Sequence, residues 1–236
     1  MEIFKSREGT LYIITPVYNE QDNFPKLYKE IKNKVKSPHK IIVVYDFDED
    51  STVPIVKEYQ KKDKDLILNK NTRGRGALNA ILSGFDYVKK GPMLVTMADL
   101  SDDLSQVDRM YRLYLEGADI VCASRYMKGG KQIGGPYIKS KLSRIAGVSL
   151  YWFRRFPTHD VTNNFKLYNK DIFKTIKIES SGGFEVAMEI TVKAFRQHRK
   201  IVELPTTWRD RTAGQSNFKL WSWLPFYLKW YLLALF

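Results

Sequence analysis

The chain has 236 residues, a formal net charge of +13 and a pI near 9.6. An apolar content of 44% and an aromatic content of 14% exclude a disordered chain, and this length predicts one domain with appendages around one large core. The basic balance predicts an anionic partner (nucleic acid, anionic lipid or a phosphorylated substrate), and the single cysteine, Cys122, excludes an intrachain disulfide or a cysteine-rich zinc site.

Apolar runs rich in β-branched residues alternate with helical patterns as far as about Arg125. Strands are expected to begin at Leu11, Lys40, Leu66, Met93 and Ala118. Helices are expected at Asn23 to Lys36, Pro54 to Lys61, Ala77 to Val88 and Leu104 to Glu116. This order predicts an α/β fold with a mainly parallel central sheet flanked by helices.

The second half opens with a glycine-rich segment from Tyr126 to Tyr137. We expect no regular element there, and a mobile loop near a strand end is a candidate lid. Further elements are expected in the order helix Ser140 to Phe153, helix Gly183 to Arg196 and strand Lys200 to Pro205.

The tail from Leu220 to Phe236 carries one charge, Lys229, and seven aromatic residues. Pro225 fits the first turn of a final helix. The run is too short and too aromatic for a membrane span, whereas tryptophan and tyrosine favour the membrane–water interface. We therefore expect a membrane-interface helix, and a membrane segment beyond residue 236 stays open. Because the N-terminus lacks a signal-peptide run, we expect a peripheral protein on the cytoplasmic face.

Polar side chains follow three of the expected strands: Tyr18 and Glu20 the first, Asp46 the second and Asp99 the fourth. Ligands of open α/β sheets bind outside the carboxyl ends of the strands, so these side chains are expected to line one crevice. Carboxylates accept hydrogen bonds from a base, tyrosine stacks on it, and oxygen ligands suit a divalent cation. The alternative is strand-end caps and solvated turns.

A glycine-bearing loop, Asn71 to Ala77, precedes the third expected helix. Gly74 and Gly76 would let backbone amides approach a phosphate at the helix N-terminus. It is not a Walker loop because the Lys-Ser/Thr pair is missing, and a lone Gly-Arg-Gly is also a common turn.

The segment Pro16-Val-Tyr18-Asn-Glu20, the acidic end of the second strand and Asp99 together resemble family 2 glycosyltransferases. The branch that the chain resembles contains dolichol-phosphate mannose synthases and their bacterial and archaeal relatives, and the resemblance runs from about Leu11 to about Phe218. It implies a GT-A-like catalytic domain over 1–218 followed by the interface helix over 219–236. The implied reaction is inverting transfer of a hexose from a nucleoside-diphosphate sugar of the GDP-mannose or UDP-glucose type.

The resemblance also implies the donor site. The implied nucleotide-binding residues are Pro16, Tyr18, Glu20, Asp46, Gly74, Gly76 and Ala98. In the family the second strand usually ends in Asp-Asp-Gly-Ser, and here it reads Tyr45-Asp46-Phe47-Asp48. Asp46 therefore keeps the second aspartate, and Tyr45 replaces the first.

A metal site is implied at Asp99 and Ser101. The family motif is Asp-X-Asp, and Met97 stands at its first aspartate. Mg²⁺ takes only one or two carboxylates beside phosphates and water, so Asp99 suffices in principle for Mg²⁺ or Mn²⁺. For Asp102 and Asp103 the plain expectation is that at least one caps the helix that follows.

Arginines are implied at the acceptor and leaving diphosphate, where guanidinium groups bind phosphate bidentately. Arg125 matches the family's Ser-Arg-Tyr, and Arg144 lies on the next expected helix. Arg211 and Ser216 match Arg-X-X-Gly-X-Ser-Lys, with Asn217 in place of the lysine. Surface arginine is the alternative in so basic a chain.

Two acceptor classes stay open. A polyprenyl phosphate is favoured by the arginines and the aromatic tail, and it needs no general base. A glycan hydroxyl is favoured by the Met97 and Asn217 departures, and Glu185 or Asp160 would supply its base.

Two other protein classes are disfavoured. A nucleotidyltransferase usually has a glycine-rich, lysine-bearing loop after the first strand, where this chain has Pro16 to Glu20. A nucleic-acid binder is disfavoured because the basic residues are scattered and no binding motif occurs, so no nucleic-acid partner is expected.

Overall fold

The computed structural model describes residues 7–210 and 220–236. Its centre is a seven-stranded sheet in the order β3-β2-β1-β4-β7-β5-β8. The bounds of these strands in chain order are Leu11–Pro16 (β1), His39–Tyr45 (β2), Leu66–Lys70 (β3), Pro92–Val95 (β4), Ile120–Ser124 (β5), Lys166–Asn169 (β7) and Ile201–Pro205 (β8). All neighbouring strands pair in parallel except β7, which is antiparallel to both β4 and β5. The expected mainly parallel sheet is therefore confirmed.

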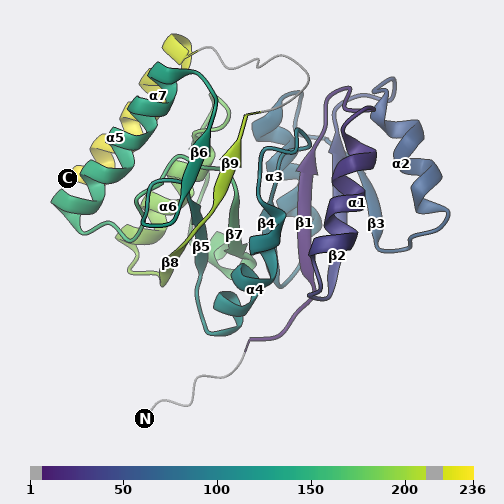
Figure 1. Ribbon diagram of the computed structural model, residues 1–236, viewed down its shortest axis with the longest axis horizontal. Coiled ribbons are helices and arrows are strands. Elements are labelled where there is room, and N and C mark those ends of the chain that lie inside the picture. Colours follow the sequence, from purple (N-terminus) through teal and green to yellow (C-terminus); the bar gives the residue numbers. More distant parts are fainter. Residues whose placement is uncertain (1–6, 211–219) are drawn as a thin grey trace.

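Helices cover both faces of this sheet (Figure 1). Their bounds are Phe24–Lys34 (α1), Thr52–Gln60 (α2), Ala77–Tyr87 (α3), Val107–Leu115 (α4), Tyr137–Arg154 (α5), Val186–Arg196 (α6) and Leu220–Leu235 (α7), with short 3-10 turns at Leu104–Gln106 and Lys170–Lys174. The apolar cluster on one face joins α1, α2 and α4 to the sheet, and the cluster on the other joins α3 and α6.

Alternating burial along the strands explains this two-sided packing. Ile13 and Ile41 are paired across β1 and β2 and belong to the α1 side, whereas Ile14 and Ile42, one residue on, belong to the α3 side. Because successive side chains of a strand point to opposite faces, near-continuous apolar runs indicate a sheet that is covered on both sides.

The glycine-rich segment Tyr126–Tyr137 differs from the sequence-based expectation. Residues Lys131–Ile133 form β6, which pairs in parallel with β9, Thr207–Arg209, as a second small sheet. The expectation of no regular element there was wrong, because the hydrogen-bonding partner lies more than seventy residues away and local composition carries no sign of it.

Helices α5 and α7 lie side by side at one end of the sheet and pack with α6 around a third apolar cluster (Figure 1). Trp230 and Ala234 of α7 are only 2% exposed there. The tail is thus helical, as expected, but Pro225 lies inside α7 rather than in its first turn. Among residues 7–210 and 220–236, no helix is long and apolar enough to cross a membrane.

Gly147 allows α5 to approach the segment that precedes β7. A Cβ atom at this position would lie 2.0 Å from the backbone oxygen of His159. Because that neighbour is backbone, a side chain could be accommodated only by moving the helix or the segment.

We therefore expect Gly147→Ala to lower the free energy of unfolding by about 1–3 kcal/mol, the range for overpacking, although alanine is the better helix former. Urea denaturation followed by circular dichroism measures this change. Lys141→Ala, at an exposed position of the same helix, is the matched control and should change stability by less than about 0.5 kcal/mol. Equal stability of the two variants would contradict the close approach.

Candidate active site

The polar strand ends predicted to meet do lie along one edge of the sheet. Strands β2, β1 and β4 are direct neighbours, so the residues that follow them are brought together in that order: Asp46 after β2, Tyr18 after β1 and Asp99 after β4. Pro16 ends β1 itself, and Ala98 is buried beside Asp99. The convergence follows from the parallel strand order.

Asp46 accepts two hydrogen bonds from the loop that precedes α3. Its Oδ2 accepts from the backbone N–H of Gly76 at 2.8 Å, and its Oδ1 accepts from Nδ2 of Asn71 at 2.8 Å. The same Asn71 amide donates to the Gly74 carbonyl at 2.6 Å, and Asn71 Oδ1 accepts from the Arg73 amide at 2.9 Å. The carboxylate of Asp46 therefore holds the loop directly before α3, the loop that the sequence suggested for a phosphate.

The carboxylate of Glu20 is also engaged, since its Oε2 accepts from Nδ2 of Asn23 at 2.7 Å. The Glu20 amide donates to Oγ1 of Thr52 at 2.9 Å, which ties the loop after β1 to the start of α2. Tyr18, in contrast, is 60% exposed.

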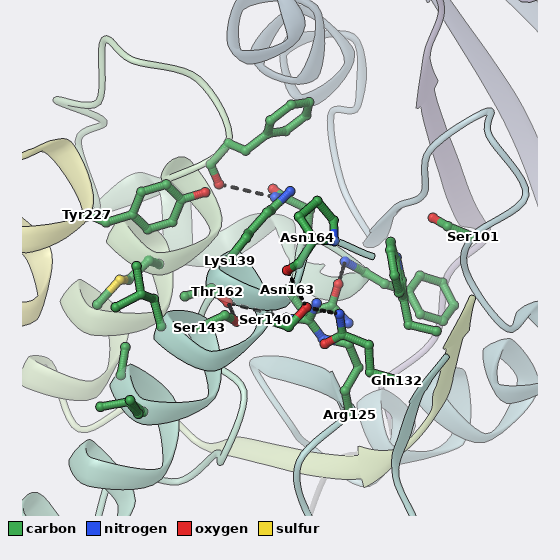
Figure 2. A pocket seen from close by; sticks show the side chains of 18 of the residues that line it. Ser101, Arg125, Gln132, Lys139, Ser140, Ser143, Thr162, Asn163, Asn164 and Tyr227 are labelled. Atoms are coloured by element: carbon green, nitrogen blue, oxygen red, sulfur yellow. Dashed lines mark hydrogen bonds between the residues drawn. The ribbon is translucent and has the colours of Figure 1, made fainter. Parts of the chain in front are cut away.

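A pocket of about 390 Å³ opens beside these strand ends, between α5, α7 and the carboxyl ends of β4 and β5 (Figure 2). Part of the pocket wall is polar and part is apolar. The polar wall residues are Asp99, Ser101, Asp102, Arg125, Gln132, Lys139, Ser140, Ser143, Thr162, Asn163 and Asn164. The apolar wall residues include Leu142, Ile145 and Ala146 of α5, Met188 of α6, and Leu224, Tyr227, Leu228 and Tyr231 of α7.

Acidic side chains stand at the polar end. Asp99 is 9% exposed, and its Oδ1 accepts from the Ser101 amide at 3.1 Å. Asp102 accepts from Oγ1 of Thr96 at 2.9 Å, and burial followed by the charge of Asp99 raises the pKa of Asp102 to about 7. Asp103 caps the following 3-10 turn by accepting from the Ser105 amide, which confirms the expectation that at least one of the two aspartates caps the next element.

Arg125 is held by a buried bidentate ion pair. Its Nε and Nη2 donate to the two carboxylate oxygens of Asp160 at 2.6 and 2.8 Å, and Nη2 also donates to Oγ of Ser143 at 3.1 Å. Burial disfavours the charged form of Arg125, but the nearby charge of Asp160 outweighs the effect of burial and raises the pKa of the arginine. Burial also disfavours the charged form of Asp160, and the charge of Arg125 outweighs this effect and lowers the pKa of the carboxyl group. Nη1 donates to none of the described residues, and Arg125 lines the pocket.

Glu185 lies behind the pocket wall rather than on it. Its side chain is fully buried, its Oε1 accepts from the Gly182 amide at 2.7 Å, and its Oε2 has no hydrogen-bond partner among the described residues. Burial and the charge of Glu185 both raise the pKa of Tyr227, which does line the pocket. Glu185 could therefore reach a substrate only across this wall.

The remaining predicted residues fall elsewhere. Arg144 is exposed on α5 and does not line the pocket. Arg211 and Ser216 lie outside the described residues.

Sequence reasoning missed the polar residues that β6 and α5 contribute, above all Gln132, Lys139, Ser140 and Ser143. The one signal that pointed toward them was the glycine-rich segment, which was interpreted as a lid.

Comparison with known proteins agrees with this geometry. The sequence profile described as Glycosyl transferase family 2 matches residues 12–177, which include all the strand ends described above. The chain belongs to glycosyl transferase family 2.

Two curated relatives of this family 2 chain carry related names. A dolichol-phosphate mannosyltransferase of Pyrococcus furiosus is 27% identical over 212 residues, which cover 88% of this chain and 58% of that protein. A polyprenol monophosphomannose synthase of Mycolicibacterium smegmatis is 28% identical over 211 residues, covering 87% of this chain and 79% of that one. The chain therefore spans little more than half the length of the Pyrococcus relative.

The fold is shared with solved structures. Glucosyl-3-phosphoglycerate synthase from Mycobacterium tuberculosis, in complex with Mn²⁺, UDP-glucose and phosphoglyceric acid, superposes with a TM-score of 0.70 at 12% identity, covering 96% of this chain and 79% of that chain. This family 2 chain thus has the GT-A type of fold, as expected from its sequence.

The Arg125–Asp160 pair gives a direct test of the site's construction. Asp160→Asn leaves the arginine buried without its counter-charge, and we expect the free energy of unfolding to fall by roughly 3–5 kcal/mol. Asp86→Asn is the matched control, because it breaks the exposed pair with Arg73 and should cost about 1 kcal/mol or less. Chemical denaturation of both variants measures the difference, and similar losses would contradict the buried pair.

Proposed function

We propose that this chain transfers a hexose from a nucleoside-diphosphate sugar to a polyprenyl phosphate. The proposal rests on the shape of the pocket. The pocket runs from the polar residues Asp99 and Arg125 to an apolar section between α5 and α7. A lipid phosphate has the same division into an anionic head and an apolar chain. The names of the Pyrococcus and Mycolicibacterium relatives support the same acceptor class.

The residues at the polar end fit a divalent cation, Mg²⁺ or Mn²⁺. Among residues 7–210 and 220–236, no three carboxylate, histidine or cysteine side chains form a complete ligand set. Asp99, with Ser101 and Asp102 beside it, would hold the ion together with the donor diphosphate and water, and Mg²⁺ commonly binds with only one or two carboxylates. The bound ion would neutralise charge on the leaving diphosphate.

Arg125 is suited to an anionic acceptor. Asp160 fixes the orientation of its guanidinium, and Nη1 remains for a phosphate oxygen in the pocket. That oxygen would attack the anomeric carbon as the bond to the diphosphate breaks, giving inversion. A phosphate is already ionised, so the step needs no general base.

A second candidate acceptor is a glycan hydroxyl. The observation in its favour is Glu185, whose Oε2 is buried without a partner among the described residues. A buried, unpaired carboxylate oxygen is unfavourable unless it serves another purpose, and proton abstraction is one such purpose.

An acceptor assay separates the two. Radiolabelled GDP- and UDP-hexoses are offered with either a polyprenyl phosphate or a hydroxyl-terminated glycan, in Mg²⁺ or Mn²⁺. We expect label in the lipid, a loss of about 10²–10³-fold for Asp99→Asn, and near-full activity for Glu185→Gln.

Asp103→Asn is the matched control for Asp99→Asn, because Asp103 only caps a turn. Label confined to the glycan, together with an inactive Glu185→Gln variant, would reject the lipid acceptor.

We further propose that the chain works at a membrane surface, on its cytoplasmic face, and that α5 contributes to docking as well as the tail. Ile138, Ile145 and Trp152 of α5 are 57–73% exposed and recur every seven residues on the side away from buried Leu150. Phe153, next to Trp152, is 77% exposed. Exposed Leu228, Leu232 and Phe236 of α7 continue this apolar surface. The basic residues of α5, which has no acidic residue, are Lys139, Lys141, Arg144 and Arg154. Anionic lipid suits such a surface.

Vesicle co-sedimentation tests the docking surface. The double variant Trp152→Ser/Phe153→Ser should bind phosphatidylserine-containing vesicles at least about tenfold more weakly, because each buried aromatic contributes to insertion. Tyr87→Ser, which removes another exposed aromatic from α3, is the control and should bind as the parent chain does. Unchanged binding of the double variant would exclude α5 from the contact.

A further inference from the structure

The two carboxylates expected to recognise the nucleobase are already used within the protein. Asp46 accepts from Gly76 and Asn71, and Glu20 accepts from Asn23. A carboxylate can accept further hydrogen bonds, so these contacts orient Asp46 and Glu20 without excluding a base, and other side chains at the ends of β1 and β2 can add to its recognition. This argument rests on the proposed nucleotide-sugar donor.

An aromatic pair with a guanidinium stands at the same strand ends. The rings of Tyr18 and Phe47 meet edge to face, with centroids 5.6 Å apart and an interplanar angle of 66°. Cζ of Arg75 lies over the Phe47 ring, 5.0 Å from its centroid. Tyr18 and Arg75 are exposed and Phe47 is half-buried, so the group borders solvent.

Hydrogen bonds hold the backbone around Arg75, and its side chain is exposed over the Phe47 ring. Asp46 and Asn71 hold the loop at both ends, through the Gly76 amide and the Gly74 carbonyl. Gly74 and Gly76 have φ values of 99° and 115°, a conformation that favours glycine. The loop thus presents Arg75 beside Phe47 at a constant place.

Phe47 also differs from the residue that the family usually has. It occupies the position at which the family usually has glycine, directly after Asp46. A glycine offers no ring, so stacking at this point depends on the phenylalanine.

We propose that Phe47 is the stacking platform for the donor's nucleobase and that Arg75 covers the opposite face of the bound base. In the free protein the guanidinium lies on the ring itself, and the base inserts between them as the exposed Arg75 side chain lifts. The ring of Tyr18, in edge-to-face contact with Phe47, borders the platform. Asp46 acts as a positioning residue, because it holds the loop that carries Arg75.

This arrangement would select a nucleobase by the area of its ring system rather than by its pattern of hydrogen-bond donors and acceptors. Stacking accepts every base because each has a π-face, and the larger ring system of a purine gains more from two faces than a pyrimidine does. The chain should accordingly bind purine nucleotides more tightly than pyrimidine nucleotides, and Phe47 should account for much of that preference.

Calorimetry on the full chain tests the platform with GMP, GDP, UMP and UDP. Phe47→Leu keeps an apolar side chain but loses the ring, and we expect its Kd values to rise about 5- to 100-fold, the range for loss of one base–aromatic stack. The factor should be the same for mono- and diphosphate, because the contact is with the base. Phe47→Tyr should restore binding.

Arg75→Lys separates stacking from charge. It keeps the cation and loses the planar fork, so weaker binding, equal for GMP and GDP, supports the sandwich. Arg73→Lys, in the same loop but paired with Asp86, is the control and should leave Kd unchanged.

The outcomes are distinct. If the parent chain binds none of the four nucleotides, the proposed donor is wrong. If it binds them and Phe47→Leu binds equally well, the platform is wrong. If Arg75→Lys keeps full affinity while Arg75→Ala loses more for GDP than for GMP, Arg75 binds phosphate and the sandwich is overturned.

Discussion

The buried pair between Arg125 and Asp160 is the interaction on which the site depends. Arg125 directly follows β5, and Asp160 lies in the segment before β7, so the pair joins the end of one strand to the segment that enters its neighbour. Ser143 adds α5 to the same cluster, and Gly147 lets that helix approach closely enough to do so. Through the hydrogen bond to Ser143, the ion pair connects the sheet edge to the helix that forms one wall of the pocket. Breaking a buried pair lowers the free energy of unfolding because the remaining charge stays uncompensated, so the pair stabilises this geometry.

Along the sheet edge, the proposed donor and acceptor sites lie on different sides of Asp99. In Figure 1 the strands β1 and β2 lie toward one side of the molecule, and α5 and α7 lie at the other. Asp99, at the end of β4, stands between these two regions in the strand order. A donor would extend from Tyr18 and Phe47 to Asp99, and an acceptor would approach from the α5–α7 side. The two substrates would meet at the polar end of the pocket without sharing a binding surface.

Much of this was predictable because it depends on local pattern. Buried strands such as β1 and β2 are continuous apolar runs. Asp99 comes four residues after β4 and Arg125 directly after β5, so their place at the sheet edge follows from the order of elements. Strand β7 was missed because it is four residues long and begins with Lys166, a buried lysine that donates to the carbonyls of Val161 and Asn163. Strands β6 and β9 were missed because each is stabilised by a distant partner. The use of Asp46 inside the protein was also unforeseeable, since it depends on where the loop before α3 folds back.

The antiparallel direction of β7 affects how the residues between Asp99 and Arg125 are arranged. It separates β4 from β5, so the strand ends that carry Asp99 and Arg125 are two strand spacings apart, roughly 10 Å. Because β7 is antiparallel, its beginning lies at the edge where β4 and β5 finish, and the chain that enters it lines the interval with Thr162, Asn163 and Asn164. An all-parallel sheet would have filled this interval with a third strand end and its outgoing loop. A single reversed strand thus acts as a spacer between Asp99 and Arg125, and its incoming segment provides amide and hydroxyl groups along the interval.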